Sequence, residues 1–217
     1  MIELTNITKE FKKGKRSTRA LSDINISIPY GSWHTITGKS GSGKSTLLYT
    51  IAGLVKPDTG RVHINGNSVY DLSPSKRANI RGKNIGFVFQ SFYLIPHLTV
   101  LENLLVSGGI FSKDTTRASA LLDRLGLSER ASHMPSELSV GEKQRTAVAR
   151  AVFCKPSIIL ADEPTGNLDS ENSDKVMSYL KEFNQEGITV VLVTHMPKEN
   201  FEVFSNECLE IADGRLL

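Results

Sequence analysis

The most informative part of this 217-residue chain is Gly38-Lys39-Ser40-Gly41-Ser42-Gly43-Lys44-Ser45-Thr46. It matches the pattern G-x-x-x-x-G-K-[ST], in which glycines let backbone N–H groups converge on phosphate oxygens without obstruction by side chains. An apolar run at 33–37 precedes it and a predicted helix at 44–52 follows it, so a helix N-terminus adds a positive partial charge at the loop. The alternative is an ordinary Gly/Ser loop, which would not require a strand directly before it and a helix directly after it. We therefore predict a phosphate-binding strand, loop and helix.

The residues of the loop have distinct expected roles. We expect Lys44 to reach the β and γ phosphates of a nucleoside triphosphate, and the Ser45 hydroxyl to bind Mg²⁺. The other residues of the loop would surround the phosphates: Gly38, Lys39, Ser40, Gly41, Ser42, Gly43 and Thr46. The loop thus predicts a site for ATP and Mg²⁺.

Two adjacent carboxylates, Asp162 and Glu163, follow the apolar run 158–161. Desolvating a carboxylate is costly, so acidic residues at the end of a buried strand indicate a functional role for the carboxylates. A solvated strand terminus is the alternative for a lone Asp-Glu pair. Downstream of the phosphate loop, we predict that Asp162 binds Mg²⁺ directly or through water and that Glu163 polarises the attacking water.

Short apolar runs alternate with helical patterns along the chain. The runs 158–161 and 190–193 are too continuously apolar for half-exposed strands, and they predict central strands of a parallel α/β sheet covered on both faces. Further strands are predicted at 24–28, 61–64 and 85–89, and helices at 115–125, 141–152 and 169–183, the last with Asp169 as N-cap. Near the end of the chain, Asp213-Gly214 predicts the turn of a β-hairpin.

The segment 90–156 has helical patterns and no strand signal, so it reads as a helical subdomain inserted into the α/β core. We therefore predict one nucleotide-binding domain over 1–217. Its core would comprise 1–89 and 157–217, and its helical subdomain 90–156.

Composition excludes several classes of protein. Hydrophobic residues make up 39% and charged residues 23%, which is ordinary globular usage and argues against disorder or a fibrous repeat. The net charge of +3 is small, and the basic cluster at 12–19 reads as a solvated loop between two strands, so we expect no nucleic-acid partner. The sequence predicts neither a spanning helix nor a signal peptide, and we expect a cytoplasmic chain.

The segment Leu138-Ser139-Val140-Gly141-Glu142-Lys143-Gln144-Arg145 resembles the LSGGQ signature of ABC-type ATPases, at the position that the family places it. Gln90 after an apolar strand, the loop 166–169, and Thr194-His195 after the last long apolar run also resemble that family. The resemblance covers the whole chain in the family's order. It implies a P-loop NTPase core with a parallel central sheet, an N-terminal antiparallel β subdomain and an inserted helical subdomain.

The resemblance also implies roles for individual residues. Two such domains sandwich ATP head to tail, so Ser139, Gly141 and Glu142 of one copy would contact nucleotide held by the other. Gln90 would touch Mg²⁺ or the attacking water, and His195 the γ-phosphate. Phe11 falls where the family has an aromatic side chain that stacks on adenine, although a plain core phenylalanine is an open alternative.

Three departures from the family pattern affect the expected turnover rate. Val140 stands where the family usually has glycine, and Glu142 where it often has glutamine. His195 is followed by Met196-Pro197, where many relatives have an acid. The glycine at 141 is retained.

The expected partners are a second copy of this chain and a separate transmembrane permease. The chain would then lie on the cytoplasmic face of the inner membrane, attached only through that permease. It resembles the group of ABC ATPases that serve lipoprotein release, macrolide efflux and peptide export, and the cell-division ABC ATPase is similar too.

Other functions compete with transport. A mechanotransmission module of the same fold, which signals through a membrane protein without transporting anything, fits the sequence equally. A DNA-repair or translation ABC ATPase would need coiled-coil insertions or two tandem nucleotide sites, and a small-molecule kinase would not explain the segment 138–145. Co-purification of the membrane partner, followed by a transport assay in vesicles, separates the first two.

Overall fold

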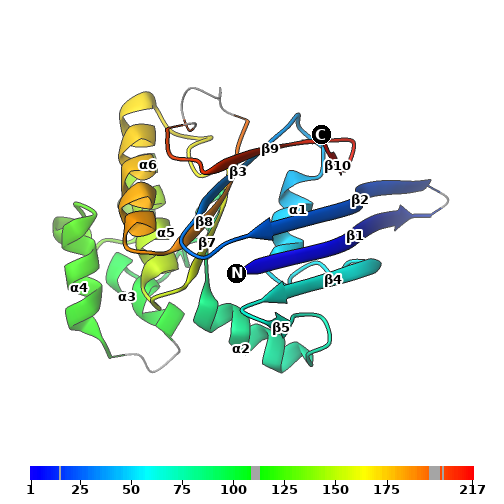
Figure 1. Ribbon diagram of the computed structural model, residues 1–217. Coiled ribbons are helices and arrows are strands. Elements are labelled where there is room, and N and C mark those ends of the chain that lie inside the picture. Colours follow the sequence, from blue (N-terminus) through cyan, green and yellow to red (C-terminus); the bar gives the residue numbers. More distant parts are fainter. Residues whose placement is uncertain (15, 109–112, 196–200, 202) are drawn as a thin grey trace.

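The structure is a computed structural model that describes residues 1–14, 16–108, 113–195, 201 and 203–217. Two sheets organise these residues (Figure 1). The larger sheet contains β3 (Trp33–Thr37), β6 (Ile85–Val88), β7 (Ile158–Asp162), β8 (Thr189–Val193), β9 (Glu207–Ala212) and β10 (Arg215–Leu216). Its strand order is β10-β9-β3-β8-β7-β6. All its pairs are parallel except the hairpin of β9 and β10, as predicted for the central sheet.

Both faces of this sheet are buried, because side chains alternate along each strand. On β7, Ile158 and Leu160 join one hydrophobic core, while Ile159 and Ala161 join the other. The first core lies toward the smaller sheet and includes helix α1 (Lys44–Ile51). The second is covered by α5 (Val140–Val152) and α6 (Ser170–Gln185). This two-sided burial explains the continuously apolar runs.

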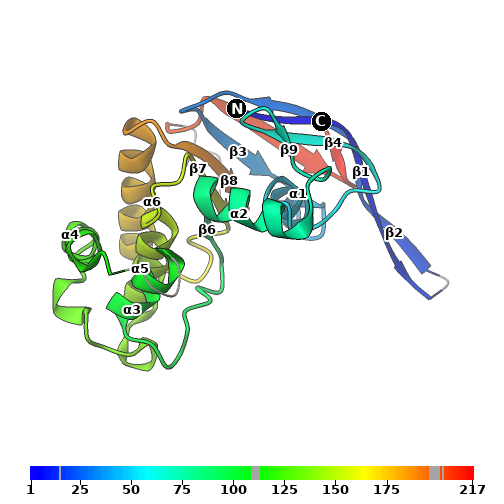
Figure 2. The ribbon, with the colours of Figure 1, turned by 90° about the horizontal axis from the view of Figure 1, so that it is seen from below.

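The smaller sheet is antiparallel, in the order β2-β1-β4-β5. Its strands are β1 (Ile2–Lys13), β2 (Arg16–Ile28), β4 (Thr59–Ile64) and β5 (Asn67–Ser68). The hairpin of β1 and β2 extends beyond the core (Figure 2). Lys12, Arg16 and Arg19 therefore lie on exposed strand ends, and the prediction of a loop for this basic cluster was wrong. The outer part of this hairpin has no buried face, so its sequence lacks the alternation of apolar and polar residues that predicts a strand.

The segment between β6 and β7 is helical in its described part. It contains α3 (Val100–Leu105), α4 (Thr115–Arg124), α5 and the short 3₁₀ turns η1 (Val106–Gly108), η2 (Ser128–Arg130) and η3 (Pro135–Glu137). Thr99 and Glu102 form a reciprocal capping box that begins α3. Asp169 caps α6 as predicted, by accepting a hydrogen bond from the N–H of Asn172 at 2.8 Å.

Helix α2 (Pro74–Asn84) was not predicted from the sequence. It buries none of its residues and so lacks the apolar stripe on which helix prediction depends. The Ser73 hydroxyl accepts a bond from the N–H of Lys76, and Pro74 occupies the first turn. Arg81 and Lys83 in the last turn are a further signal, typical of a helix end.

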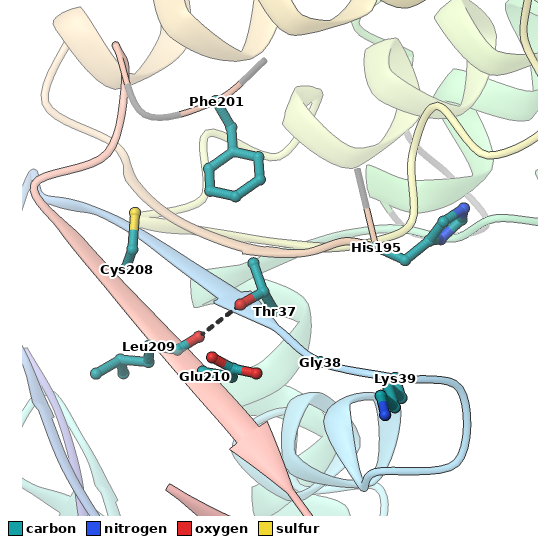
Figure 3. Close-up of a pocket in the computed structure, with 8 residues that line it drawn as sticks. All are labelled: Thr37, Gly38, Lys39, His195, Phe201, Cys208, Leu209 and Glu210. Atoms are coloured by element: carbon teal, nitrogen blue, oxygen red, sulfur yellow. Dashed lines mark hydrogen bonds between the residues drawn. The ribbon is translucent and has the colours of Figure 1, made fainter. Parts of the chain in front are cut away.

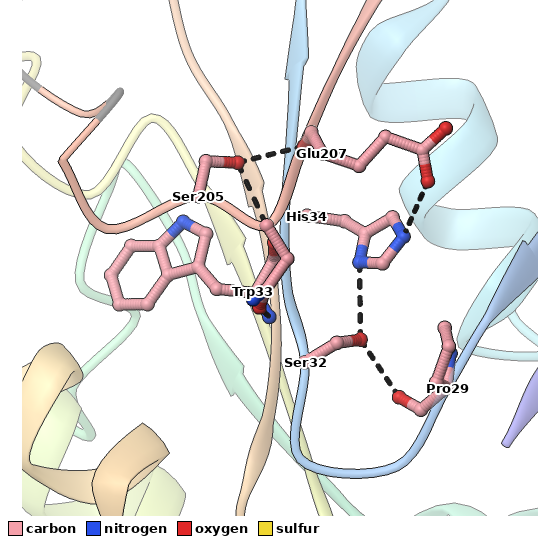
Figure 4. A network of polar contacts seen from close by, with 7 residues as sticks. Pro29, Ser32, Trp33, His34, Ser205 and Glu207 are labelled. Atoms are coloured by element: carbon pink, nitrogen blue, oxygen red, sulfur yellow. Dashed lines mark hydrogen bonds and ion pairs between the residues drawn. The ribbon is translucent and has the colours of Figure 1, made fainter.

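A polar network joins β9 to β3 and to the turn that precedes β3 (Figure 4). His34 is 2% exposed, and its two ring nitrogens lie 3.0 Å from Glu207 Oε2 and 3.1 Å from Ser32 Oγ. The Ser32 hydroxyl donates to the carbonyl of Pro29 at 2.8 Å. Burial lowers the pKa of His34, which the nearby Glu207 only partly opposes, so the neutral ring is favoured.

Candidate active site

The phosphate loop lies between the end of β3 and the start of α1, as predicted. Gly43 is the N-cap of α1 with φ 112°, and a Cβ there would overlap the carbonyl oxygen of Ala20. Only glycine fits this position without displacing backbone. No side chain caps α1, so the first N–H groups of the helix remain available to an anion. The loop thus provides a cradle of backbone donors suited to phosphate.

Lys44 folds back over this loop. Its Nζ donates to the carbonyls of Gly38 at 2.7 Å and Lys39 at 2.9 Å, and the residue is 5% exposed. A buried ammonium needs such acceptors to offset its lost hydration. The Ser42 hydroxyl of the same loop is buried without a hydrogen-bond partner among the described residues. The Lys44 ammonium and the Ser42 hydroxyl are therefore both buried at the phosphate loop.

A carboxylate and two hydroxyls meet below the cradle. The Ser45 hydroxyl donates to Asp162 Oδ1 at 3.0 Å, and the Tyr49 hydroxyl also hydrogen-bonds the Asp162 carboxylate. Burial raises the pKa of Asp162, and these hydrogen bonds oppose the shift. Burial, followed by the nearby Asp162 charge, raises the pKa of Tyr49 to about 12. A cation at Asp162 would favour its ionised form.

Glu163 and His195 stand together at the same edge of the sheet. His195 Nδ1 lies 3.0 Å from Glu163 Oε2. The register of β7 and β8 pairs Asp162 with Val193, which brings the residues that follow both strands side by side. Glu163 has φ 47°, and its N–H donates to the carbonyl of Val193 at 2.9 Å. This unusual conformation for a non-glycine residue is typical of functional sites.

A hollow of about 450 Å³ brings most of the predicted residues together. Phe11 lines it at 46% exposure, so the alternative of a core phenylalanine is wrong. Gln90 lies beside Gly166, and the Asn167 side-chain amide donates to the Gln90 carbonyl at 3.1 Å. The hollow is lined by Phe11, Thr18, Ala20, Ser40, Gly41, Gly43, Lys44, Ser45, Thr46, Gln90 and Glu163.

A second cavity, of about 610 Å³, adjoins the other side of the loop (Figure 3). Gly38, Lys39 and His195 line it together with residues of β9. The Thr37 hydroxyl donates to the carbonyl of Leu209 at 3.3 Å across its floor. His195 therefore borders this cavity as well as contacting Glu163. Met196 and Pro197, which follow it, lie outside the described residues.

The segment at 139–142 does not line either cavity. Ser139 is the N-cap of α5 and forms a capping box with Glu142: the N–H of Ser139 donates to Glu142 Oε2 at 2.8 Å, and the N–H of Glu142 donates to Ser139 Oγ at 3.2 Å. Val140 is 46% exposed. A Cβ on Gly141 would overlap the side chain of Asn172, so packing against α6 also requires this glycine. The structure does not bring this segment to the phosphate loop of the same chain.

The sequence profile described as "ABC transporter" matches residues 21–166 of the chain. This chain belongs to the ABC transporter family. It is similar to the lipoprotein-releasing system ATP-binding protein LolD of Shewanella oneidensis, with 42% identity over 91% of this chain and 88% of that protein. It is also 40% identical to the macrolide export ATP-binding/permease protein MacB of Burkholderia pseudomallei, over 100% of this chain but 34% of MacB.

A solved structure of an ATP-binding cassette supports the assignment to this family. The dimeric ATP-binding cassette MJ0796, in a post-hydrolysis state bound to ADP and Pi, matches with a TM-score of 0.92 and 41% identity, covering 100% of this chain and 96% of that one. The predicted ABC ATPase fold is thereby confirmed, as are ATP binding and ATPase activity as the functional class. Within the described part of the chain, every helix is too short or too polar to cross a membrane.

Sequence reasoning missed Tyr49 in this ABC ATPase. A signal existed, because Tyr49 stands four residues after Ser45 and shares its helix face. Asn167 belonged to a recognised loop but had no assigned role. Its contact with Gln90 joins residues far apart in sequence, which a local pattern does not reveal.

Proposed function

We propose that this chain binds and hydrolyses Mg-ATP with the residues that the sequence singled out. The observation that carries the proposal is one hollow beside an uncapped helix N-terminus, lined by Lys44, Ser45 and Glu163. Asp162 accepts a hydrogen bond from the Ser45 hydroxyl of that lining. The backbone from Gly38 to Thr46 would hold the phosphates and Lys44 would neutralise them. Phe11, exposed at the rim, would stack on adenine.

Mg²⁺ fits the oxygen donors at this site. Ser45, Asp162 and Gln90 would hold it, together with phosphate oxygens. When bound, the ion neutralises charge that develops on the transferred phosphoryl group.

Glu163 would accept a hydrogen bond from the attacking water and so orient it. His195 would orient the Glu163 carboxylate through their contact and reach the γ-phosphate with its exposed ring. Both groups follow central strands of a rigid sheet. Positioning by such strands is what phosphoryl transfer requires of the protein.

The second half of the site would come from another copy of the chain. Ser139, Gly141 and Glu142 lie at a helix N-terminus that faces neither described cavity of its own chain, and the similar cassette MJ0796 is dimeric. The Ser139 side chain and the N–H of Gly141 would contact the γ-phosphate bound by the partner, and Glu142 would lie beside that nucleotide. Dimerisation would therefore depend on ATP.

The closing dimer would drive a separate transmembrane permease at the cytoplasmic face of the inner membrane. The similarity to LolD and MacB favours an exporter of lipoproteins, peptides or drugs. Membrane association would occur only through the permease.

The test combines two variants with recovery of the partner. Glu163→Gln should retain ATP affinity, lose nearly all hydrolysis and form an ATP-dependent homodimer, whereas Lys44→Ala should weaken nucleotide binding itself. Tagged Glu163→Gln purified from membranes with ATP should recover a permease, whose cargo is then assayed in vesicles. Unchanged turnover in Glu163→Gln would refute the assignment of the base. A recovered membrane protein that transports nothing would indicate mechanotransmission instead.

A further inference from the structure

Arg130 lies against the signature segment and has no role in the function described so far. Its Nε donates to Glu142 Oε1 at 2.8 Å, while Glu142 Oε2 accepts from the N–H of Ser139. Both oxygens of Glu142 are thus held by groups of the same chain. Glu142, which stands where the family often has glutamine, is therefore held in one orientation.

Arg130 is presented by an anchored turn. It ends η2, its N–H donates to the carbonyl of Leu127 at 2.9 Å, and its own carbonyl accepts from the N–H of His133 at 2.9 Å. Leu127 is fully buried in the hydrophobic core. The guanidinium is consequently held toward Glu142 by a fixed backbone.

Glu142 carries a full negative charge where a phosphate is expected. The backbone hydrogen bond from Ser139, followed by the bond from Arg130, lowers the pKa of Glu142 to about 2, so the group is ionised at neutral pH. It occupies the third position of α5, where a carboxylate offsets the positive potential of the helix N-terminus. A triphosphate approaching that terminus would meet like charge.

We propose that Arg130 is a positioning residue that compensates the charge of Glu142 and thereby allows the signature segment to approach the phosphates bound by a second copy of the chain. This inference rests on the proposed ATP-dependent dimer. In the separated chain the pair is partly solvated, with Arg130 at 41% and Glu142 at 17% side-chain exposure, and such pairs add little to folding stability. Closure of the dimer would remove water from the pair, and the charge of Glu142 would then act on the phosphates at short range.

The experiment measures dimerisation in the Glu163→Gln background with Mg-ATP, by sedimentation equilibrium at low and high salt. Arg130→Ala should raise the dimer dissociation constant by about tenfold at low salt, and the deficit should shrink at high salt, because salt screens charge. Arg130→Lys should retain most of the affinity. The affinity of each monomer for a fluorescent ATP analogue should stay unchanged, since the residue lies outside the phosphate cradle.

The decisive comparison repeats Arg130→Ala in a chain that also carries Glu142→Gln. With the carboxylate removed, Arg130→Ala should change dimerisation by less than about twofold. Arg124→Ala is the matched control, because it removes an arginine of α4 that is paired with Glu182 and Glu186 at the end of α6, and it should leave dimerisation unaffected.

Two results would overturn the inference while leaving the proposed function intact. One is an equal loss of dimer affinity whether or not the chain also carries Glu142→Gln, which would make Arg130 a purely structural contact. The other is an unchanged dissociation constant in Arg130→Ala. A Glu163→Gln parent that binds ATP yet stays monomeric would contradict the composite site itself, and this inference with it.

Discussion

His195 Nδ1 lies 3.0 Å from Glu163 Oε2, so the two groups that follow β8 and β7 form one unit at the edge of the sheet. Glu163 is 21% exposed at its side chain and His195 61%, which leaves the histidine ring accessible to a nucleotide. A histidine in this place restricts the orientation of the carboxylate. The consequence is that the two residues should not act independently in hydrolysis.

His195→Ala should lower kcat by about a hundredfold while ATP affinity changes little, because the carboxylate loses its orienting contact. A variant that carries both His195→Ala and Glu163→Gln should have a kcat little below that of Glu163→Gln alone, since the two residues act as a unit. Steady-state ATPase assays with calorimetric titration measure both quantities. His63→Ala, on β4, serves as the control. Fully additive losses would show that the contact has no catalytic role.

Tyr49→Phe should raise the Mg²⁺ concentration needed for half-maximal ATPase activity by about threefold to tenfold, because Asp162 loses a hydrogen bond that favours its ionised form. The apparent Mg²⁺ affinity should also become more sensitive to acid, since the pKa of Asp162 would rise further. Magnesium titrations at several pH values measure this. An unaltered Mg²⁺ requirement would exclude Tyr49 from the metal site.

Phe11→Ala should weaken ATP binding by about tenfold through loss of stacking, while Phe11→Tyr should retain it. Inorganic tripolyphosphate, which has no base, should bind the wild type and Phe11→Ala equally well. Calorimetric titration compares the two ligands. Equal weakening for both ligands would mean that Phe11 supports the phosphate loop rather than the base.

Gly141→Ala should destabilise the chain by about 1–3 kcal/mol, because the added methyl group overlaps the side chain of Asn172. Asn172→Ala should recover part of that loss when combined with it, although it also removes the acceptor for Arg145. Urea unfolding of both single variants and the double variant gives the coupling. Strict additivity would contradict the steric explanation.

Stability should fall as the pH drops below about 6.5, the ordinary pKa of histidine. Burial lowers the pKa of His34 in the folded chain, so the unfolded chain binds a proton more readily and acid favours unfolding. His34→Gln should flatten this dependence below about pH 6.5, whatever its effect on stability at neutral pH. Urea unfolding across this range measures the slopes. Identical slopes would exclude His34 as the titrating group.

Sequence patterns are sufficient to predict the phosphate loop, the carboxylate pair and the central strands. Each of these depends on residues close together in the chain. Gly43 has a positive φ that favours glycine, and Asp162 and Glu163 lie at the end of one strand that is buried on both faces. The signature segment was equally local, since Ser139 and Glu142 cap the same helix. Such features depend on local spacing, which can be read from the sequence.

Contacts between side chains far apart in the chain could not be predicted, because they depend on how the elements pack. The pairing of Asp162 with Val193 brings Glu163 to His195, and the placement of η2 beside α5 brings Arg130 to Glu142. Helix α2 likewise required the structure, because a helix without buried residues has no apolar period. These features depend on strand register and on the packing of elements far apart in the chain, and neither is encoded in the spacing of neighbouring residues.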